Sequence, residues 1–121
     1  NMEVKRQLAL TQLQDGRAET AIDLLNSIVY NNNEVDAKDM LYLAAAHWFA
    51  NNTQKAIELF VNFLKKTGEK PSHTHSGIDE MLHLLDAMAE KYERSAIDIR
   101  ILTDIVADEM EANNSPNINN N

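Results

Sequence analysis

The chain has 121 residues, a formal net charge of −8 and no cysteine. This length allows one domain with a substantial core but hardly two, and the lack of cysteine excludes disulfides, thiolate zinc sites and a cysteine nucleophile. An acidic surface without a basic stripe repels phosphate groups, so the composition argues against binding to nucleic acid or to an anionic membrane.

Two helices are predicted in the first part of the chain, over residues 3–14 and 18–29. Gly16 lies between them and can take the left-handed conformation that ends a helix without steric cost. Because the connection is so short, the two helices are expected to form an antiparallel hairpin. The apolar residues that recur at helical spacing in them are Val4, Leu8, Ala9, Leu13, Ala21, Ile22, Leu25, Ile28 and Val29.

A second pair of helices is predicted over residues 37–50 and 53–66. Asp36 is a suitable amino-terminal cap, and Asn51 tolerates the left-handed conformation that ends the first helix of this pair. The helix over residues 37–50 is apolar nearly all round, which is typical of a helix packed between neighbours. We therefore expect it at the centre of the fold.

The region after residue 66 contains a predicted loop over residues 68–77 and then no glycine or proline as far as residue 112. One continuous helix over residues 78–112 is an alternative, but a break near Glu93 and Arg94 is preferred because the apolar pattern changes there. Beyond the break two apolar stripes run side by side. They consist of Ile97, Ile101 and Ile105, and of Ile99, Leu102 and Val106.

The last residues form a low-complexity polar run that begins at Asn113. Such a run cannot bury enough apolar area to offset the entropy lost on ordering. We therefore expect a single domain over residues 1–112 and a disordered Asn-rich tail over residues 113–121.

A short block recurs in the second helix of each predicted hairpin, as Ala21-Ile22-Asp23-Leu24, Ala56-Ile57-Glu58-Leu59 and Ala96-Ile97-Asp98-Ile99. The intervals are 35 and 40 residues, and the period that characterises tetratricopeptide repeats is about 34. The chain thus resembles a tetratricopeptide-repeat protein, although Arg100 replaces a large apolar residue in the third hairpin. The resemblance implies an all-α fold of three antiparallel helical hairpins stacked as a short, TPR-like, right-handed array.

The resemblance also implies a concave groove lined by the first helix of each hairpin, a surface that suits an amphipathic helix or an extended peptide. One subclass of the family grips a peptide carboxylate with basic residues, but the corresponding positions here (Arg6, Leu10, Tyr42, Ile78 and Leu82) include a single basic residue, which excludes that subclass. The expected groove residues are Arg6, Leu10, Leu13, Lys38, Leu41, Ala45, Trp48 and Phe49.

Two aromatic residues of this groove allow two interpretations. Trp48 and Phe49 are adjacent, so they are not expected to face the same way on a helix. Both could belong to the core, which aromatic residues dominate, or one could be an exposed anchor for a partner. The neighbouring His47 is interpreted as a half-buried, hydrogen-bonded histidine.

A metal site is the only catalytic alternative that the residues offer. His73 and His75 lie in the predicted loop, and Asp79 and His83 share one face of the following helix. A solvated polar loop is the preferred interpretation. Since no phosphate-binding loop, nucleophile elbow or metalloprotease motif is present, we predict no catalytic residue, no cofactor and no metal.

The predicted function is therefore that of a protein-interaction module, an adaptor or chaperone-like protein with a protein or peptide partner. Small acidic helical-repeat proteins of this kind resemble the chaperones of bacterial secretion systems in size and charge. The absence of cysteine and of a visible secretory signal favours a cytoplasmic location. The alternative function is self-association, in which the groove or an uncapped end of the array meets a second copy.

Overall fold

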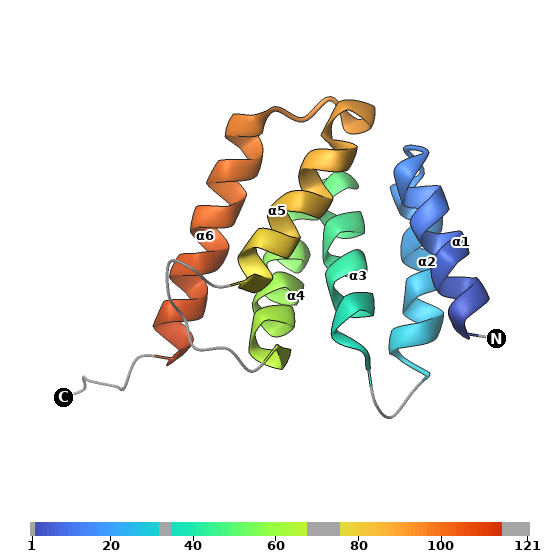
Figure 1. Ribbon diagram of the computed structural model, residues 1–121, viewed down its shortest axis with the longest axis horizontal. Coiled ribbons are helices and arrows are strands. Elements are labelled where there is room, and N and C mark those ends of the chain that lie inside the picture. Colours follow the sequence, from blue (N-terminus) through green and yellow to red (C-terminus); the bar gives the residue numbers. More distant parts are fainter. Residues whose placement is uncertain (1, 32–34, 68–75, 115–121) are drawn as a thin grey trace.

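The computed structural model describes residues 2–31, 35–67 and 76–114, and within these ranges the chain is helical apart from short connections (Figure 1). No strand occurs in these ranges, so the prediction of an all-α fold is confirmed for them. The helical segments are α1 (Met2–Gln14), α2 (Ala18–Val29), α3 (Ala37–Phe49), α4 (Thr53–Lys66), α5 (Ser76–Met88), the 3-10 turn η1 (Ala89–Tyr92) and α6 (Ala96–Asn114).

The helices lie side by side, and consecutive helices run in opposite directions (Figure 1). α1 packs on α2, α2 on α3 and α3 on α4, while α4 contacts both α5 and α6. α1 also contacts α3, and α3 contacts α5. Because α3 has neighbours on several sides, most of its residues are buried, as expected for the central helix.

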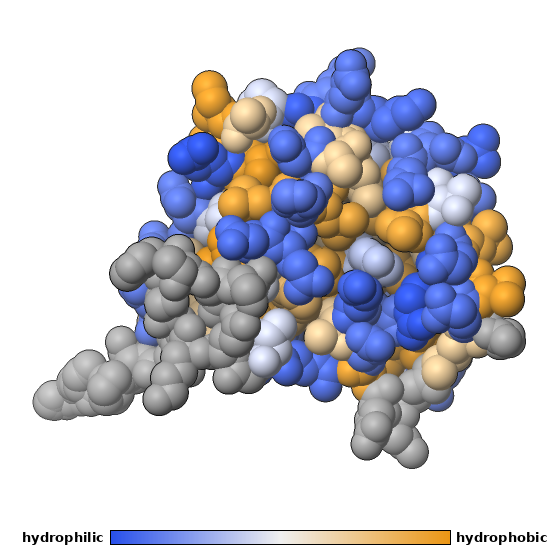
Figure 2. All heavy atoms as spheres, in the orientation of Figure 1, coloured by the Kyte–Doolittle hydropathy of each residue, from blue (hydrophilic) through white to orange (hydrophobic). Residues whose placement is uncertain are grey.

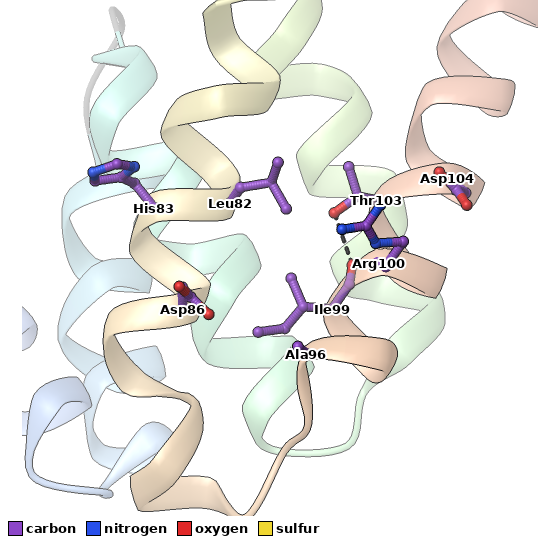
Figure 3. A pocket seen from close by; sticks show the side chains of 8 residues that line it. All are labelled: Leu82, His83, Asp86, Ala96, Ile99, Arg100, Thr103 and Asp104. Carbon is purple, nitrogen blue, oxygen red and sulfur yellow. Dashed lines mark hydrogen bonds between the residues drawn. The ribbon is translucent and has the colours of Figure 1, made fainter.

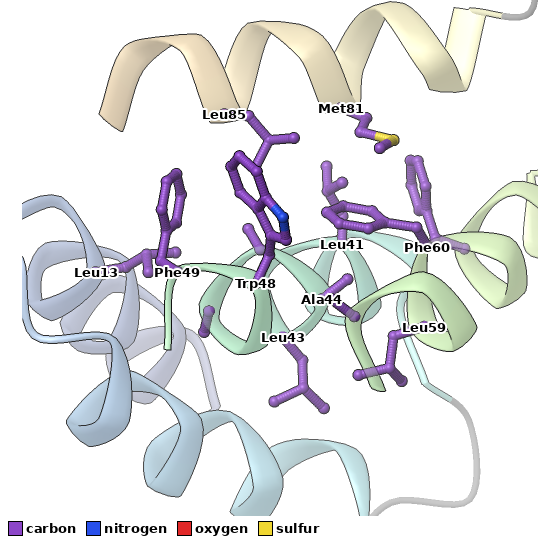
Figure 4. Close-up of a cluster of buried hydrophobic side chains, with 14 of the residues drawn as sticks. Leu13, Leu41, Leu43, Ala44, Trp48, Phe49, Leu59, Phe60, Met81 and Leu85 are labelled. Atoms are coloured by element: carbon purple, nitrogen blue, oxygen red, sulfur yellow. The ribbon is translucent and has the colours of Figure 1, made fainter. Parts of the chain in front are cut away.

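The core is built on both sides of α3. Leu43 points toward α2, whereas Trp48 points toward Leu85 of α5 (Figure 4). Removing large apolar side chains from water is the dominant favourable contribution to folding. The largest apolar side chains with almost no exposed surface are Phe60, Phe63, Leu13, Leu25, Leu43 and Leu64.

Three of the helical segments end in the same hydrogen-bonded turn. α1, α3 and η1 are followed by residues in the left-handed conformation, namely Gly16 (φ 87°), Asn51 (φ 69°) and Glu93 (φ 56°). In each turn this residue donates its N–H to the carbonyl three residues back, and the next residue donates to the carbonyl five residues back. This is the Schellman motif, which satisfies carbonyls at a helix end. The predicted helix ends at Gly16, Asn51 and near Glu93 are confirmed.

The hydrogen bonds after these turns define which residues of the second helices are equivalent. Ala21, Ala56 and Ile99 are each the fourth residue of their helix, and each donates its N–H to the carbonyl of the residue that precedes the helix. All three are buried. Ala96, which the recurring block equates with Ala21 and Ala56, is exposed and lies one turn too early. The expected match of the third block is therefore wrong.

The reason for this offset is a capping box at the start of α6. The N–H of Asp98 donates to Ser95 Oγ (3.1 Å), and the N–H of Ser95 donates to Asp98 Oδ2 (3.0 Å). Hydrogen bonds from Ser95 hold the pKa of the Asp98 carboxyl below its usual value, and the bond from the Ser95 N–H has the largest effect. The cap predicted for α3 is confirmed, since Asp36 accepts a hydrogen bond of 2.9 Å from the N–H of Lys38.

The carboxyl end of α6 lies at Asn114, two residues beyond the predicted domain boundary at residue 112. No glycine or proline lies between Gly77 and Pro116, so none stops α6 earlier. The rest of the tail expected to be disordered, residues 115–121, and residues 68–75 of the predicted loop lie outside the described residues. Within the described ranges no helix has the length and hydropathy of a membrane span, even α6 with its 19 residues.

The third pair of helices contacts the first two through α3 and α4, and it is further attached through η1 and the turn that follows it. The Tyr92 ring stacks on Phe49 with 4.3 Å between the ring centroids, and the Tyr92 hydroxyl donates to the carbonyl oxygen of Leu13 at 2.6 Å. Burial raises the pKa of Tyr92 to about 12. Arg94 lies over the Trp48 ring at 4.5 Å and donates from Nη2 to the Trp48 carbonyl oxygen at 2.9 Å.

A buried ion pair joins α1 to α3. Asp39 has 1% of its surface exposed, and both of its carboxylate oxygens accept from Arg6, Oδ2 at 2.7 Å from Nη2 and Oδ1 from Nε. Arg6 also donates from Nη1 to the exposed Glu3 at 2.6 Å. Such a bidentate pair fixes the relative position of the two helices. The hydrogen bond to Asp39 also raises the pKa of Arg6.

The buried pair generates the first prediction. Asp39→Ala leaves the Arg6 guanidinium without its buried partner, so the free energy of unfolding is expected to fall by about 3 kcal/mol. Urea unfolding followed by circular dichroism measures this change. Lys55→Ala, which removes the exposed pair between Lys55 and Glu58, is the matched control and should change stability by less than about 1 kcal/mol. Equal effects of the two variants would contradict a structural role for Asp39.

Candidate functional site

The groove expected from the sequence is not open in this structure. Trp48 and Phe49 are at most 5% exposed, because α5 and η1 cover this side of α3 (Figure 4). Their ring centroids lie 5.1 Å apart, and both rings belong to the core. Of the two interpretations of these residues, the one that places both in the core is confirmed, although they are adjacent on α3. The other expected groove residues that are buried are Leu13, Leu41 and Ala45.

Three expected groove residues retain some exposure, but they do not form a surface with the others. Arg6 is engaged by Asp39, so its guanidinium is not available to a partner's carboxylate. Leu10 is partly buried against the core, and Lys38 is exposed in the first turn of α3. The eight residues therefore do not build the expected apolar groove.

Exposed large apolar side chains gather instead on two other helices. On α1 they are Met2, Val4 and Leu8, and in Figure 2 apolar atoms reach the surface along this helix at the right edge. A second group lies on α6, and apolar atoms also reach the surface at the upper left, beside the amino end of that helix. This second group consists of Ile97, Ile101 and Ile105, with exposed fractions of 71%, 53% and 39%.

α6 has two apolar faces with different environments. Residues four apart share one side of a helix with about 3.6 residues per turn, so Ile97, Ile101 and Ile105 form a continuous row, called here the isoleucine face. The opposite face packs on α4 and α5. It consists of the buried residues Ile99, Leu102, Val106 and Met110.

The first two hairpins show what normally occupies the positions of the isoleucine face. When the second helices are aligned on Ala21, Ala56 and Ile99, the three isoleucines correspond to polar residues that are mostly exposed. These are Glu19, Asp23 and Ser27 in α2, and Gln54, Glu58 and Asn62 in α4. The third hairpin has thus replaced a solvated polar face by an apolar one, which is the kind of surface that marks an interaction site.

A small cleft adjoins the isoleucine face. Ile101 and Ile105 line it together with Leu102, and Trp48, Thr53, Arg94 and Asp98 complete it. Its volume of about 170 Å³ lies below the range of about 300–1,000 Å³ of small-molecule sites. The cleft is therefore better suited to a side chain of another protein than to a separate ligand.

A larger cleft of about 460 Å³ lies between α5 and α6 (Figure 3). Leu82 and Ile99 extend toward each other across it, and the buried Thr103 hydroxyl donates to the carbonyl oxygen of Ile99 at 2.7 Å. Its other lining residues are His83, Asp86, Ala96, Arg100 and Asp104. Exposed charges of both signs border it, whereas small-molecule sites are predominantly apolar and enclosed.

The metal site considered from the sequence cannot be placed in the structure. His73 and His75 lie outside the described residues, and Asp79 and His83 are both exposed on α5. Among the residues that the structure describes, no three histidine or acidic side chains are close enough to hold a metal ion.

His47 is half-buried and hydrogen-bonded, as expected. Its Nδ1 lies 3.0 Å from Nδ2 of Asn52, so a neutral imidazole accepts a hydrogen bond from the amide. Burial, with a smaller effect from the charge of Lys55, holds the pKa of His47 below its usual value of 6.5.

No family model, no curated protein and no solved structure matches this chain. Since an all-α fold by itself does not define a function, the function has to be inferred from the surfaces of the molecule. The isoleucine face is the surface in which the third hairpin departs from the first two. The sequence contains its signal, three isoleucines at four-residue spacing beside a second apolar stripe, but periodicity alone does not say which stripe is buried.

The burial of Trp48 leads to the second prediction. Trp48→Ala removes a core aromatic side chain, which typically costs about 3–5 kcal/mol, and the melting temperature should fall by more than about 10 °C. Differential scanning fluorimetry measures this shift. Tyr30→Ala, at an aromatic residue that is 63% exposed, is the control and should melt close to the wild type. An unchanged melting temperature for Trp48→Ala would mean that the ring is an exposed anchor after all.

His47 leads to the third prediction. In the folded protein the pKa of His47 lies below its usual value, whereas in the unfolded chain it is about 6.5. The unfolded state therefore carries more protons in this window, and the free energy of unfolding decreases as the pH falls below about 6.5. His47→Gln should flatten this dependence below about pH 6.5, and His83→Gln, at an exposed position of α5, is the control. Urea midpoints at a series of pH values test this, and an equal slope in both variants contradicts it.

Proposed function

We propose that this chain is a protein-interaction module, an adaptor or chaperone-like protein that binds a helix or peptide of a partner in the cytoplasm. The single observation that supports the proposal is the isoleucine face of α6. A contiguous apolar row flanked by charged residues is typical of a surface that another protein covers.

We further propose that the helices form a short, right-handed array similar to tetratricopeptide repeats. Three helix pairs with matching turns support this reading, as do the contacts of α1 with α3 and of α3 with α5. In such arrays each hairpin buries an apolar face against the next one. The exposed apolar face of α6 is then a place where a further helix can pack.

A second candidate function is self-association through the same face. The even spacing of Ile97, Ile101 and Ile105 favours it, because a ridge of residues four apart can pack into the groove of a symmetric copy. Light scattering over a wide concentration range separates the two candidates. A monomer at all concentrations fits a binding module, and a dimer that disappears in Ile101→Asp fits self-association.

The fourth prediction concerns partner capture from extract of the native cell. Ile101→Asp places a charge in the middle of the isoleucine face, where the side chain is 53% exposed, so stability should change by no more than about 0.5 kcal/mol. Proteins that co-purify with the wild type should be lost. Leu8→Asp, at an apolar residue of α1 that is 45% exposed, is the matched control and should retain them. If both variants retain the same proteins, α6 is not the binding surface.

A further inference from the structure

We infer that the isoleucine face of α6 binds an amphipathic helix whose apolar row is flanked by lysine or arginine residues. This inference rests on the proposed function and specifies the chemistry of the partner. It follows from three features of the surface: the charges beside the isoleucines, the shape of the row and its cleft, and the charge of the whole molecule.

The charges beside the isoleucine face are acidic on both sides. By helical geometry, Asp104 borders the row on one side, Asp98 and Glu109 border it on the other, and Asp108 follows it at the carboxyl end. All four are exposed. An apolar partner with basic flanks would place its cations against these carboxylates, and complementary charge of this kind favours one class of partner over others.

The nearby cations do not neutralise this acidic border. Arg94 lines the small cleft beside the row and its charge acts on Asp98, but its guanidinium is held over the Trp48 ring and donates to Asn51 Oδ1 at 2.6 Å. Arg100 lies one turn before Asp104 and lines the same cleft between α5 and α6, so these two cations offset only part of the four carboxylates. The local charge therefore has the same sign as the net charge of the chain, −8.

The shape of the surface favours a helix over an extended peptide. Isoleucines at every fourth position form a ridge that fits between the ridges of a second helix. The cleft bounded by Ile101, Ile105 and Trp48 lies beside this ridge and can receive an apolar side chain of the partner. An extended peptide binds along a sheet edge or in an aromatic-lined groove, whereas the described residues include no strand and α6 presents a ridge of isoleucines.

A second copy of this chain is a poorer occupant. In a symmetric pairing of α6 with itself, Asp98, Asp104 and Asp108 of both copies would lie along one seam. Like charges brought together in an interface oppose association, and each copy would also carry its net charge of −8 into the pair.

Three synthetic peptides of about 18 residues, long enough to form helices, provide the test. The first has a leucine row with lysine flanks, the second has the same row with glutamate flanks, and the third has the composition of the first with the leucines scattered. Fluorescence anisotropy measures their binding to the full chain and to Ile101→Asp, Leu8→Asp and Asp104→Lys/Asp108→Lys. Asp98 is left intact because its carboxylate accepts the Ser95 N–H in the capping box of α6.

The lysine-flanked peptide should bind at least about tenfold more tightly than either of the other two, and less tightly as salt is raised from about 0.05 to 0.5 M. Ile101→Asp should abolish its binding, Leu8→Asp should not, and the double lysine variant should prefer the glutamate-flanked peptide.

Other results overturn the inference in distinguishable ways. Equal binding of the lysine- and glutamate-flanked peptides refutes the role of charge but leaves the proposed binding module intact. Equal binding of the scattered peptide, binding that survives Ile101→Asp, or no binding of any peptide refutes the site. A dimer in sedimentation that Ile101→Asp dissociates shows that a second copy occupies the face. The proposed function itself is tested separately, by the capture of partner proteins from cell extract.

Discussion

The contact of Tyr92 and Arg94 with Trp48 and Phe49 is the interaction on which the rest of the arrangement depends. It attaches the third helix pair to the first two by stacking, a cation over an aromatic ring and hydrogen bonds to main-chain oxygens. Because these bonds are made to backbone atoms of α1 and α3, they define one position for η1. The position of η1 in turn determines which side of α6 faces α4 and which side faces solvent.

Much of the helical framework could be predicted because its signals are local. Gly16, Asn51 and Asp36 act through their own backbone preferences or side chains, so their roles follow from residue type and position. The register of the third hairpin could not be predicted from the recurring block. A shift of three residues is nearly one helical turn, and the apolar periodicity hardly changes. The signal that would have set the register is the Ser95–Asp98 capping box.

The prediction of the groove was wrong for a different reason. A tryptophan at this position of the pattern is the same residue whether it is buried in a core or exposed in a groove. The sequence therefore does not distinguish these two roles of Trp48. Only the position of α5 decides this. Polar residues carry more information: Asp39 on an otherwise apolar helix requires a buried partner, and Arg6, expected to face a ligand, is that partner. The isoleucine stripe was visible in the sequence, but its exposure was not.

The aspartates of α6 also bear on how the chain avoids misfolding. A helix with two apolar faces could dock on α4 in either rotation about its own axis. Docking through the isoleucines would bring Asp98, Asp104 or Asp108 to the edge of the core, and an unpaired carboxylate is costly to bury. Among the α6 side chains that the structure describes, Thr103 is the one buried polar residue, and its hydroxyl is satisfied within the helix by Ile99. The carboxylates therefore disfavour the wrong rotation, so the acidic border would be retained even in a chain that had lost its partner.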